Sequence, residues 1–208
     1  IDTGMGLERL AVICQDVNNL FEVDTVQNIM KHIISIAGIE YHANEKHDVS
    51  LRVITDHIRS TTFMIGDGVI PSNVGRGYVL RRILRRAVRY GKKLGIAEPF
   101  LYKMVSIVVE NMKQFYGYLQ DKQAIVEKII KTEEENFLRT LETGEKKLND
   151  IITVNKKNGL DTISGKDAFL LYDTFGFPIE LTEEISSEAS FKVDIDGFKE
   201  ELNAQKMR

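Results

Sequence analysis

The sequence has 208 residues, of which 43% are hydrophobic and 28% charged, proportions that exclude a disordered or fibrous chain. Its formal net charge is −3, and its single cysteine, Cys14, excludes a disulfide framework and a zinc site built on cysteine pairs. No apolar run has the length of a membrane span, so we expect a protein of the reducing cytoplasm, without membrane contact. The first residues are Ile1-Asp2 rather than Met, which leads us to expect a piece of a longer protein.

Residues 1–13 predict the end of a strand, a glycine turn and a helix. Gly4 and Gly6 would let a ligand approach the backbone closely, and a helix start offers free N–H groups to an anion. Arg9, in the first turns, could add a contact to phosphate. Taken alone, a glycine turn before a helix is more often only a turn.

Two amphipathic helices are predicted next, at residues 24–37 and 50–65, each closed by glycine. We expect Asp56, His57 and Arg59 in the second helix to form a hydrogen-bonded network that braces a neighbouring helix. His42 and His47 fall in a polar loop at 40–48 and are expected to be solvated rather than to bind a metal. No histidine pair has ligand spacing, so no metal site is predicted.

The segment between Val69 and Ala97 concentrates the positive charge, with six Arg, two Lys and no acid. The rest of the chain therefore carries 20 basic and 31 acidic residues, a balance of −11. A helical projection places the basic side chains on one arc and the apolar ones on the other. Because no acid lies within reach along this helix, we expect the arc to face outward as a ridge that binds nucleic acid or another polyanion, rather than as an ordinary solvated face. The arc contains Arg81, Arg82, Arg85, Arg86, Arg89, Lys92 and Lys93.

Five further segments complete a mainly α prediction. Helices are expected at 98–116, 121–157, 164–176, 180–189 and 195–207, with short strands near 162–163 and 191–193. The segment 121–157 predicts one long strut helix, in which a kink would fall at Gly144. A coiled coil is the alternative, although the apolar positions do not hold a strict heptad.

Several of these stretches together resemble one family, the alanyl-tRNA synthetases of class II. The segment 2–10 (DTGMGLERL) resembles the family's motif 3, and 50–60, 67–73 and 76–82 resemble its middle region. So do 131–135 (KTEEE) and 171–178 (LYDTFGFP), and the matches occur in the family's order along the whole chain. The resemblance implies two domains: the edge of a class II catalytic domain at 1–20, and a helical, bundle-like domain for recognition of the tRNA acceptor stem at 21–208.

The resemblance also implies an enzyme, a ligase that activates alanine with ATP and transfers it to the 3′ end of tRNA(Ala). Arg9 stands where the family contacts ATP, Gly4 and Gly6 where the nucleotide lies against the backbone, and Asp2 near the amino group of alanine. The whole enzyme would use ATP and Mg²⁺, and zinc is expected only in an editing domain that these residues do not include. Since motifs 1 and 2 are absent as well, we expect this piece to need no cofactor and to make no alanyl-adenylate by itself.

For tRNA, the resemblance implies that Asn73 and Asp173 read a G·U wobble pair from the minor groove of the acceptor stem. Without it, each would be taken for a residue that caps or ends a helix. The basic arc would hold the RNA backbone, and to it the prediction adds Arg76. Two alternatives stay open: a generic helical RNA-binding module, and a structural module whose ridge docks an acidic protein.

Overall fold

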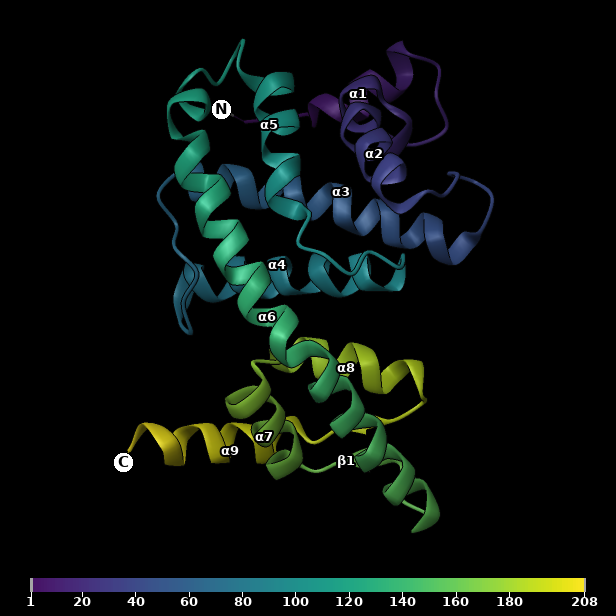
Figure 1. The fold of residues 1–208 in the computed structure, drawn as a ribbon, viewed down its shortest axis with the longest axis vertical. Helices are drawn as coiled ribbons and strands as arrows, with labels where there is room; N and C mark the ends of the chain where they lie inside the picture. Colours follow the sequence, from purple (N-terminus) through teal and green to yellow (C-terminus); the bar gives the residue numbers. More distant parts are fainter. Residues whose placement is uncertain (1, 208) are drawn as a thin grey trace. The chain divides into compact units, whose positions relative to one another are not determined.

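The chain is mainly helical, as a computed structural model that describes residues 2–207 shows (Figure 1). Within that range two two-residue strands are present besides the helices, which confirms the mainly α prediction. The chain divides into two compact units, Ile1–Glu134 and Glu135–Arg208, which are described separately below. The predicted boundary between residues 20 and 21 stays a prediction. The helices are α1 (Leu7–Cys14), η1 (Leu20–Glu22), α2 (Asp24–Ala37), α3 (Glu45–Gly66), α4 (Gly75–Lys93), α5 (Leu101–Met112), α6 (Tyr118–Lys157), α7 (Gly165–Phe175), α8 (Ile179–Glu188) and α9 (Ile195–Lys206).

The first unit is built on α3, which lies alongside α4 and also packs against α2 and α5 (Figure 1). Apolar side chains at helical spacing meet there, because positions three and four apart share one face of a helix. Burial of each such side chain contributes about 1.5–3 kcal/mol of transfer free energy. The fully buried ones include Ile29, Ile33, Leu51, Ile54, Ile58, Leu80, Leu84, Leu101 and Val105.

A side-chain cap explains why α3 begins before the residue at which the apolar pattern predicts its start. The helix α3 begins at Glu45, earlier than predicted, because the Asn44 side chain accepts a hydrogen bond from Lys46 N at 2.9 Å. The helix α2 has the predicted bounds and ends at Gly38, whose φ of +66° suits glycine. The predicted strand at the first residues is wrong: residues 2–6 form no strand, and no neighbouring strand pairs with them within the described chain.

The long helix α6 is continuous over 40 residues and passes through Gly144 without a break. Its first part belongs to the first unit and the remainder, from Glu135, to the second. A Cβ atom at Gly144 would lie 2.6 Å from Cε1 of Phe177. Glycine at this position therefore serves the close packing of an aromatic ring on α6 rather than a kink.

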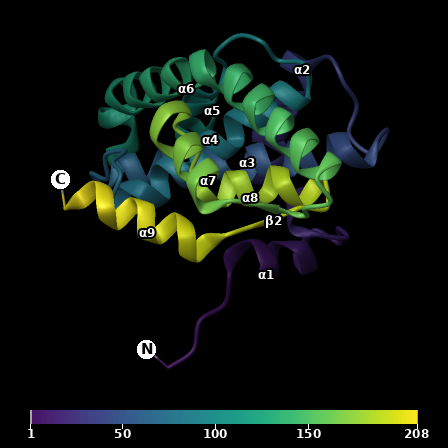
Figure 2. The same ribbon diagram turned by 90° about the horizontal axis from the view of Figure 1, so that it is seen from below.

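The second unit packs α7 against α9, and Figure 2 shows the two helices side by side. The Ser164 hydroxyl caps α7 by accepting a hydrogen bond from Asp167 N at 3.1 Å, as the sequence predicted. The strands β1 (Thr162–Ile163) and β2 (Lys192–Val193) pair in parallel, close to the two short strands predicted there. Phe137, Leu171, Phe177 and Phe198 are buried in this unit.

Candidate nucleic-acid interface

A tight loop carries Asn73 to the start of the basic helix α4. The Ser72 hydroxyl donates to the carbonyl of Val74 at 2.8 Å, and Gly75 adopts a φ of +56° as the helix begins. A Cβ atom at Gly77 would collide with the carbonyl oxygen of Ile70 and with the Ser72 hydroxyl. The loop is therefore pressed against the first turn of α4, and it leaves Asn73 exposed.

The Asn73 side chain is held by a chain of polar contacts that reaches α6. Its amide oxygen accepts a short hydrogen bond from the guanidinium of Arg81, which lies eight residues later in the sequence, on α4. Arg81 Nε lies 3.1 Å from Oε1 of Glu133, although the alignment falls short of a hydrogen bond. The same carboxylate oxygen accepts from Arg85 Nε at 2.8 Å and from its Nη2 at 2.5 Å. One buried carboxylate thus serves two arginines of the basic helix.

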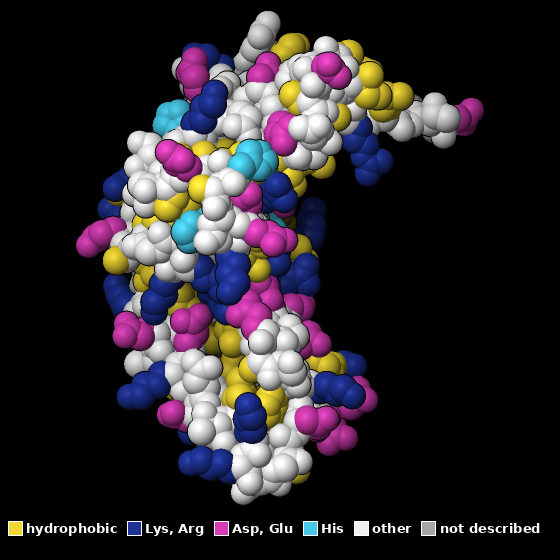
Figure 3. Space-filling model, turned by 90° about the vertical axis from the view of Figure 1, so that its right-hand side faces the viewer, with side chains coloured by type: hydrophobic (Ala, Val, Ile, Leu, Met, Phe, Trp, Pro, Cys, Tyr) yellow, Lys and Arg dark blue, Asp and Glu magenta, His cyan; other side chains and the backbone are white. Residues whose placement is uncertain are grey.

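The prediction of an outward-facing ridge on α4 is wrong in part. Arg89 is buried, with 4% of its surface exposed, and Arg81, Arg82, Arg85 and Arg86 are half-buried. Arg81 and Arg85 are drawn inward because Glu133 lies within reach of both on α6, whereas α4 itself offers no acid. Arg76, at the first turn, is exposed. On the face drawn in Figure 3, Lys and Arg side chains still gather at the level of α4.

Glu134, next to Glu133 on α6, has a different role. It is 1% exposed, and its carboxylate accepts hydrogen bonds from the backbone N–H groups of Phe100 at 2.8 Å and Leu101 at 3.1 Å. These are free N–H groups at the first turn of α5, where negative charge is favourable. Glu134 therefore fixes the first turn of α5, while Glu133 contacts Arg81 and Arg85 of α4.

The predicted bracing network on α3 forms in part: His57 links Asp56 to α4, whereas Arg59 pairs with Glu8 of α1. His57 Nδ1 lies 2.9 Å from Oδ2 of Asp56, and His57 Nε2 lies 3.1 Å from a guanidinium nitrogen of Arg86 on α4. The hydrogen bond from His57 holds the pKa of Asp56 below its usual value, and the charges of Arg59 and Arg86 act in the same direction. Asp56 is largely exposed, with 58% of its side chain accessible.

The N-terminal segment that resembles motif 3 carries exposed polar groups. Asp2 and Arg9 are exposed, and neither side chain has a hydrogen bond or ion pair within residues 2–207. A Cβ atom at Gly4 would meet no described atom within 4 Å, and Gly6 precedes α1 with extended backbone. The adjacent Glu8 pairs with Arg59 of α3; burial raises the pKa of Glu8, but a backbone hydrogen bond and Arg59 outweigh it, so the net pKa is lowered.

Asp173 lies in the second unit, exposed on α7. Its Oδ1 accepts a hydrogen bond from Nε2 of Gln205 on α9 at 2.7 Å. Both side chains are exposed, so this contact supports the carboxylate less firmly than buried contacts would. The structure thus places Asn73 and Asp173 in separate units, each on its own helical support.

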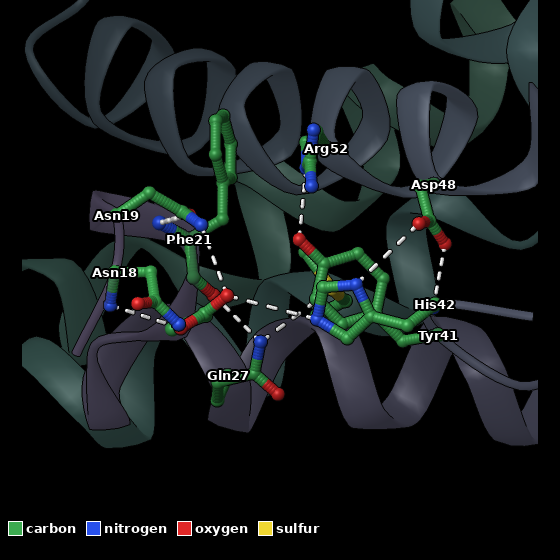
Figure 4. Close-up of polar contacts among 10 residues, drawn as sticks. Asn18, Asn19, Phe21, Gln27, Tyr41, His42, Asp48 and Arg52 are labelled. Carbon is green, nitrogen blue, oxygen red and sulfur yellow. Dashed lines mark hydrogen bonds and ion pairs between the residues drawn. The ribbon is translucent and has the colours of Figure 1, made fainter. Parts of the chain in front are cut away.

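A second polar cluster ties η1 and the loop before α3 to α3 itself (Figure 4). His42 lies 3.6 Å from Oε1 of Glu22 and 3.6 Å from Oδ2 of Asp48, and its backbone N–H donates to Asp48 at 2.8 Å. The Arg52 Nε donates to the Tyr41 hydroxyl at 2.8 Å. The backbone N–H of Asn18 holds the pKa of Glu22 below its usual value. The cluster anchors a loop, and the described residues contain no group of three His, Cys, Asp or Glu side chains arranged to hold a metal ion.

Sequence reasoning did not identify Glu133 and Glu134 as site or support residues. Consecutive glutamates in a long charged helix have the pattern of a solvated face, yet both are buried. The available signal was the absence of any acid between Val69 and Ala97, since half-buried arginines need carboxylates from elsewhere in the fold.

None of the helices in residues 2–207 has the combination of length and apolar character that crossing a bilayer requires.

Comparison with known proteins gives one consistent family. The family model described as tRNA synthetases class II (A) matches residues 1–208. An alanine–tRNA ligase of Acetivibrio thermocellus is 54% identical over 202 residues, which cover 97% of this chain and 23% of that protein. Those of Natranaerobius thermophilus and Clostridioides difficile are each 49% identical over 99% and 100% of this chain, and over 24% of their own length. The chain therefore spans about a quarter of the length of these relatives.

Proposed function

The chain belongs to the tRNA synthetases of class II (A), and from that premise we propose that it is the part of an alanine–tRNA ligase that recognises the acceptor stem of tRNA(Ala). The observation that carries the proposal is the exposed Asn73 at the start of a basic helix, with its side chain held by Arg81. A solvated cap residue would not need such a brace. The reading of a G·U wobble pair by Asn73 and Asp173 is part of the same proposal.

The chemistry of the two side chains suits the minor groove of an RNA helix. In A-form RNA this groove is wide and shallow, so side chains can reach the base edges there. Guanine presents an amino group in the minor groove, which is a hydrogen-bond donor. The exposed carboxylate of Asp173 is an acceptor with capacity beyond its contact to Gln205.

The orientation of the Asn73 amide follows from its partner. A guanidinium only donates hydrogen bonds, so the amide oxygen of Asn73 faces Arg81 and its NH₂ group is left for a ligand. Asn73 would therefore act as a donor toward an acceptor on a base edge. The two residues would then offer the RNA complementary groups, a donor from the first unit and an acceptor from the second.

The arginines of α4 would supply the electrostatic part of binding. Exposed Arg76 would contact phosphate directly, and Arg81, Arg82, Arg85 and Arg86 are half-buried, so they would contribute mainly positive potential and local support. Phosphate contacts of this kind set register without reading sequence. Arg89 is buried, so its role would be structural rather than in contact with RNA.

In the whole enzyme, Asp2, Gly4, Gly6 and Arg9 would form the edge of the site that activates alanine with ATP. Exposed Arg9 suits a polyphosphate, and the open space beside Gly4 suits a nucleotide close to the backbone. The carboxylate of Asp2 suits the ammonium group of alanine. Because these residues would form only one edge of that site, we expect the 208-residue chain to show no ATP–pyrophosphate exchange by itself.

The proposal is tested by Asn73→Ala and Asp173→Ala in the full-length ligase. The measurement is kcat/KM for tRNA(Ala) with its G·U pair and for the same tRNA with G·C. Each variant should lose about 1–3 kcal/mol of the discrimination between the two tRNAs. Equal losses on both tRNAs would contradict base-pair reading and favour a generic RNA-binding module.

A further inference from the structure

We propose that Glu133 is a positioning residue for wobble-pair recognition, because it holds Arg81 and, through Arg81, the amide of Asn73. This inference rests on the proposed function and adds to it a residue that does not touch the RNA. Glu133 lies on α6, far along the chain from Asn73, and 8% of its surface is exposed.

The geometry requires a carboxylate at this position. Arg81 and Arg85 are one helical turn apart on α4, and their like charges would repel each other in a half-buried environment. Oε1 of Glu133 lies 3.1 Å from Nε of Arg81 and 2.8 Å from Nε of Arg85. A negative charge between the two guanidinium groups lets both lie close together, and the side chain of Arg81 then extends back along α4 to Asn73.

Arg81 therefore divides its guanidinium between two partners. Its Nε faces Glu133, and its terminal nitrogen donates to the amide oxygen of Asn73. The ion pair with Glu133 restrains the Nε end of the planar guanidinium, which favours one direction for its terminal N–H. The consequence is a preset orientation of the Asn73 NH₂ group, so that less conformational entropy is lost when RNA binds.

Glu134 provides an internal contrast for this inference. Glu134 is the next residue on α6 after Glu133, but its carboxylate caps the first turn of α5. Loss of Glu134 should therefore lower stability without a particular effect on specificity. Loss of the Glu133 charge should lower specificity. Glu133 contacts Arg81, Arg81 holds Asn73, and the NH₂ group of Asn73 is the one proposed to contact the RNA.

The test is Glu133→Gln in the full-length ligase, with kcat/KM measured for the G·U and G·C forms of the tRNA. Glutamine has nearly the same shape but no charge, so discrimination should fall by about five- to tenfold. Glu133→Asp keeps the charge and should recover part of the loss. Glu110→Gln is the matched control, since it removes an exposed carboxylate that pairs with Lys113 on the surface of α5, and it should leave discrimination unchanged.

The double variant Glu133→Gln with Asn73→Ala separates the possible results. If Glu133 acts through Asn73, the double variant discriminates no worse than Asn73→Ala alone. Equal losses on both tRNAs for Glu133→Gln, no loss, or losses that add to those of Asn73→Ala, would overturn this inference while the proposed function stands. If Asn73→Ala itself leaves discrimination unchanged, the proposed function fails and the inference fails with it.

Discussion

Asn73 and Asp173, the two proposed reading residues, differ in how the fold supports them. Asn73 is exposed but stands on a layered support: a loop pressed on α4, the guanidinium of Arg81, and a buried carboxylate behind it. Asp173 is exposed on α7 and is held by one hydrogen bond from an exposed glutamine.

The difference follows from the chemistry of the two side chains. An amide has a donor end and an acceptor end, so its orientation determines what it offers to a ligand, and a neighbour that only donates fixes that orientation. An ionised carboxylate has two equivalent oxygens that only accept hydrogen bonds, so its orientation matters less. We therefore expect RNA recognition to depend strongly on the support of Asn73 and only weakly on that of Asp173.

Gly77→Ala should have the largest effect on stability of these variants, because it disturbs the loop that supports Asn73. The added methyl group would collide with the Ile70 carbonyl and the Ser72 hydroxyl, and so it would push the Asn73 loop off α4. We expect the free energy of unfolding to fall by about 1–3 kcal/mol, as for other overpacked sites. Urea unfolding measures this.

Gly117→Ala is the control for that experiment. A methyl group at Gly117 would be 3.6 Å from the nearest atom, the carbonyl oxygen of Lys113, which is ordinary contact. Stability should stay within about 0.5 kcal/mol of the parent. If both glycine variants unfold alike, the close approach of the loop to α4 is not the cause.

Gln205→Ala tests the other side of the comparison and should have a smaller effect. The glutamine is exposed, so its loss should change the free energy of unfolding by no more than about 0.5 kcal/mol. Because a carboxylate needs little orientation, discrimination between G·U and G·C tRNAs should also change little. A loss as large as that of Asp173→Ala would show that Asp173 is as dependent on its support as Asn73 is.

Asp56→Asn combined with acid tests the contact between α3 and α4, away from both reading residues, and should have only a small effect. The hydrogen bond from His57 lowers the pKa of Asp56 in the folded protein, so the carboxylate stabilises the fold above its usual pKa near 3.8 and this contribution is lost as pH falls through the lowered value. Because Asp56 is largely exposed, the variant should be less stable by under about 1 kcal/mol at pH 6. Urea unfolding at pH 6 and at about pH 3 should show the deficit shrinking. A deficit that grows in acid would contradict the assignment.

Most of the fold could be predicted from the sequence, because helix periodicity and caps are local signals. The bounds of α2 and the cap at Ser164 follow from such patterns. The inward turn of Arg89 and the burial of Glu133 could not be predicted this way, because they depend on which helix packs against α4. Gly144 shows the same limit: its role became evident only with Phe177 packed against it.

The most direct test of the central proposal is binding of the 208-residue chain to two acceptor-stem RNA hairpins, one with a G·U pair and one with G·C, over a series of salt concentrations. Both affinities should fall with salt, because phosphate contacts release counterions. We expect tighter binding of the G·U hairpin at every salt concentration, with a roughly constant ratio between the two affinities, since base contacts are less sensitive to salt. Equal affinity for both hairpins across the series would contradict the claim that these residues contain a complete surface for reading the wobble pair.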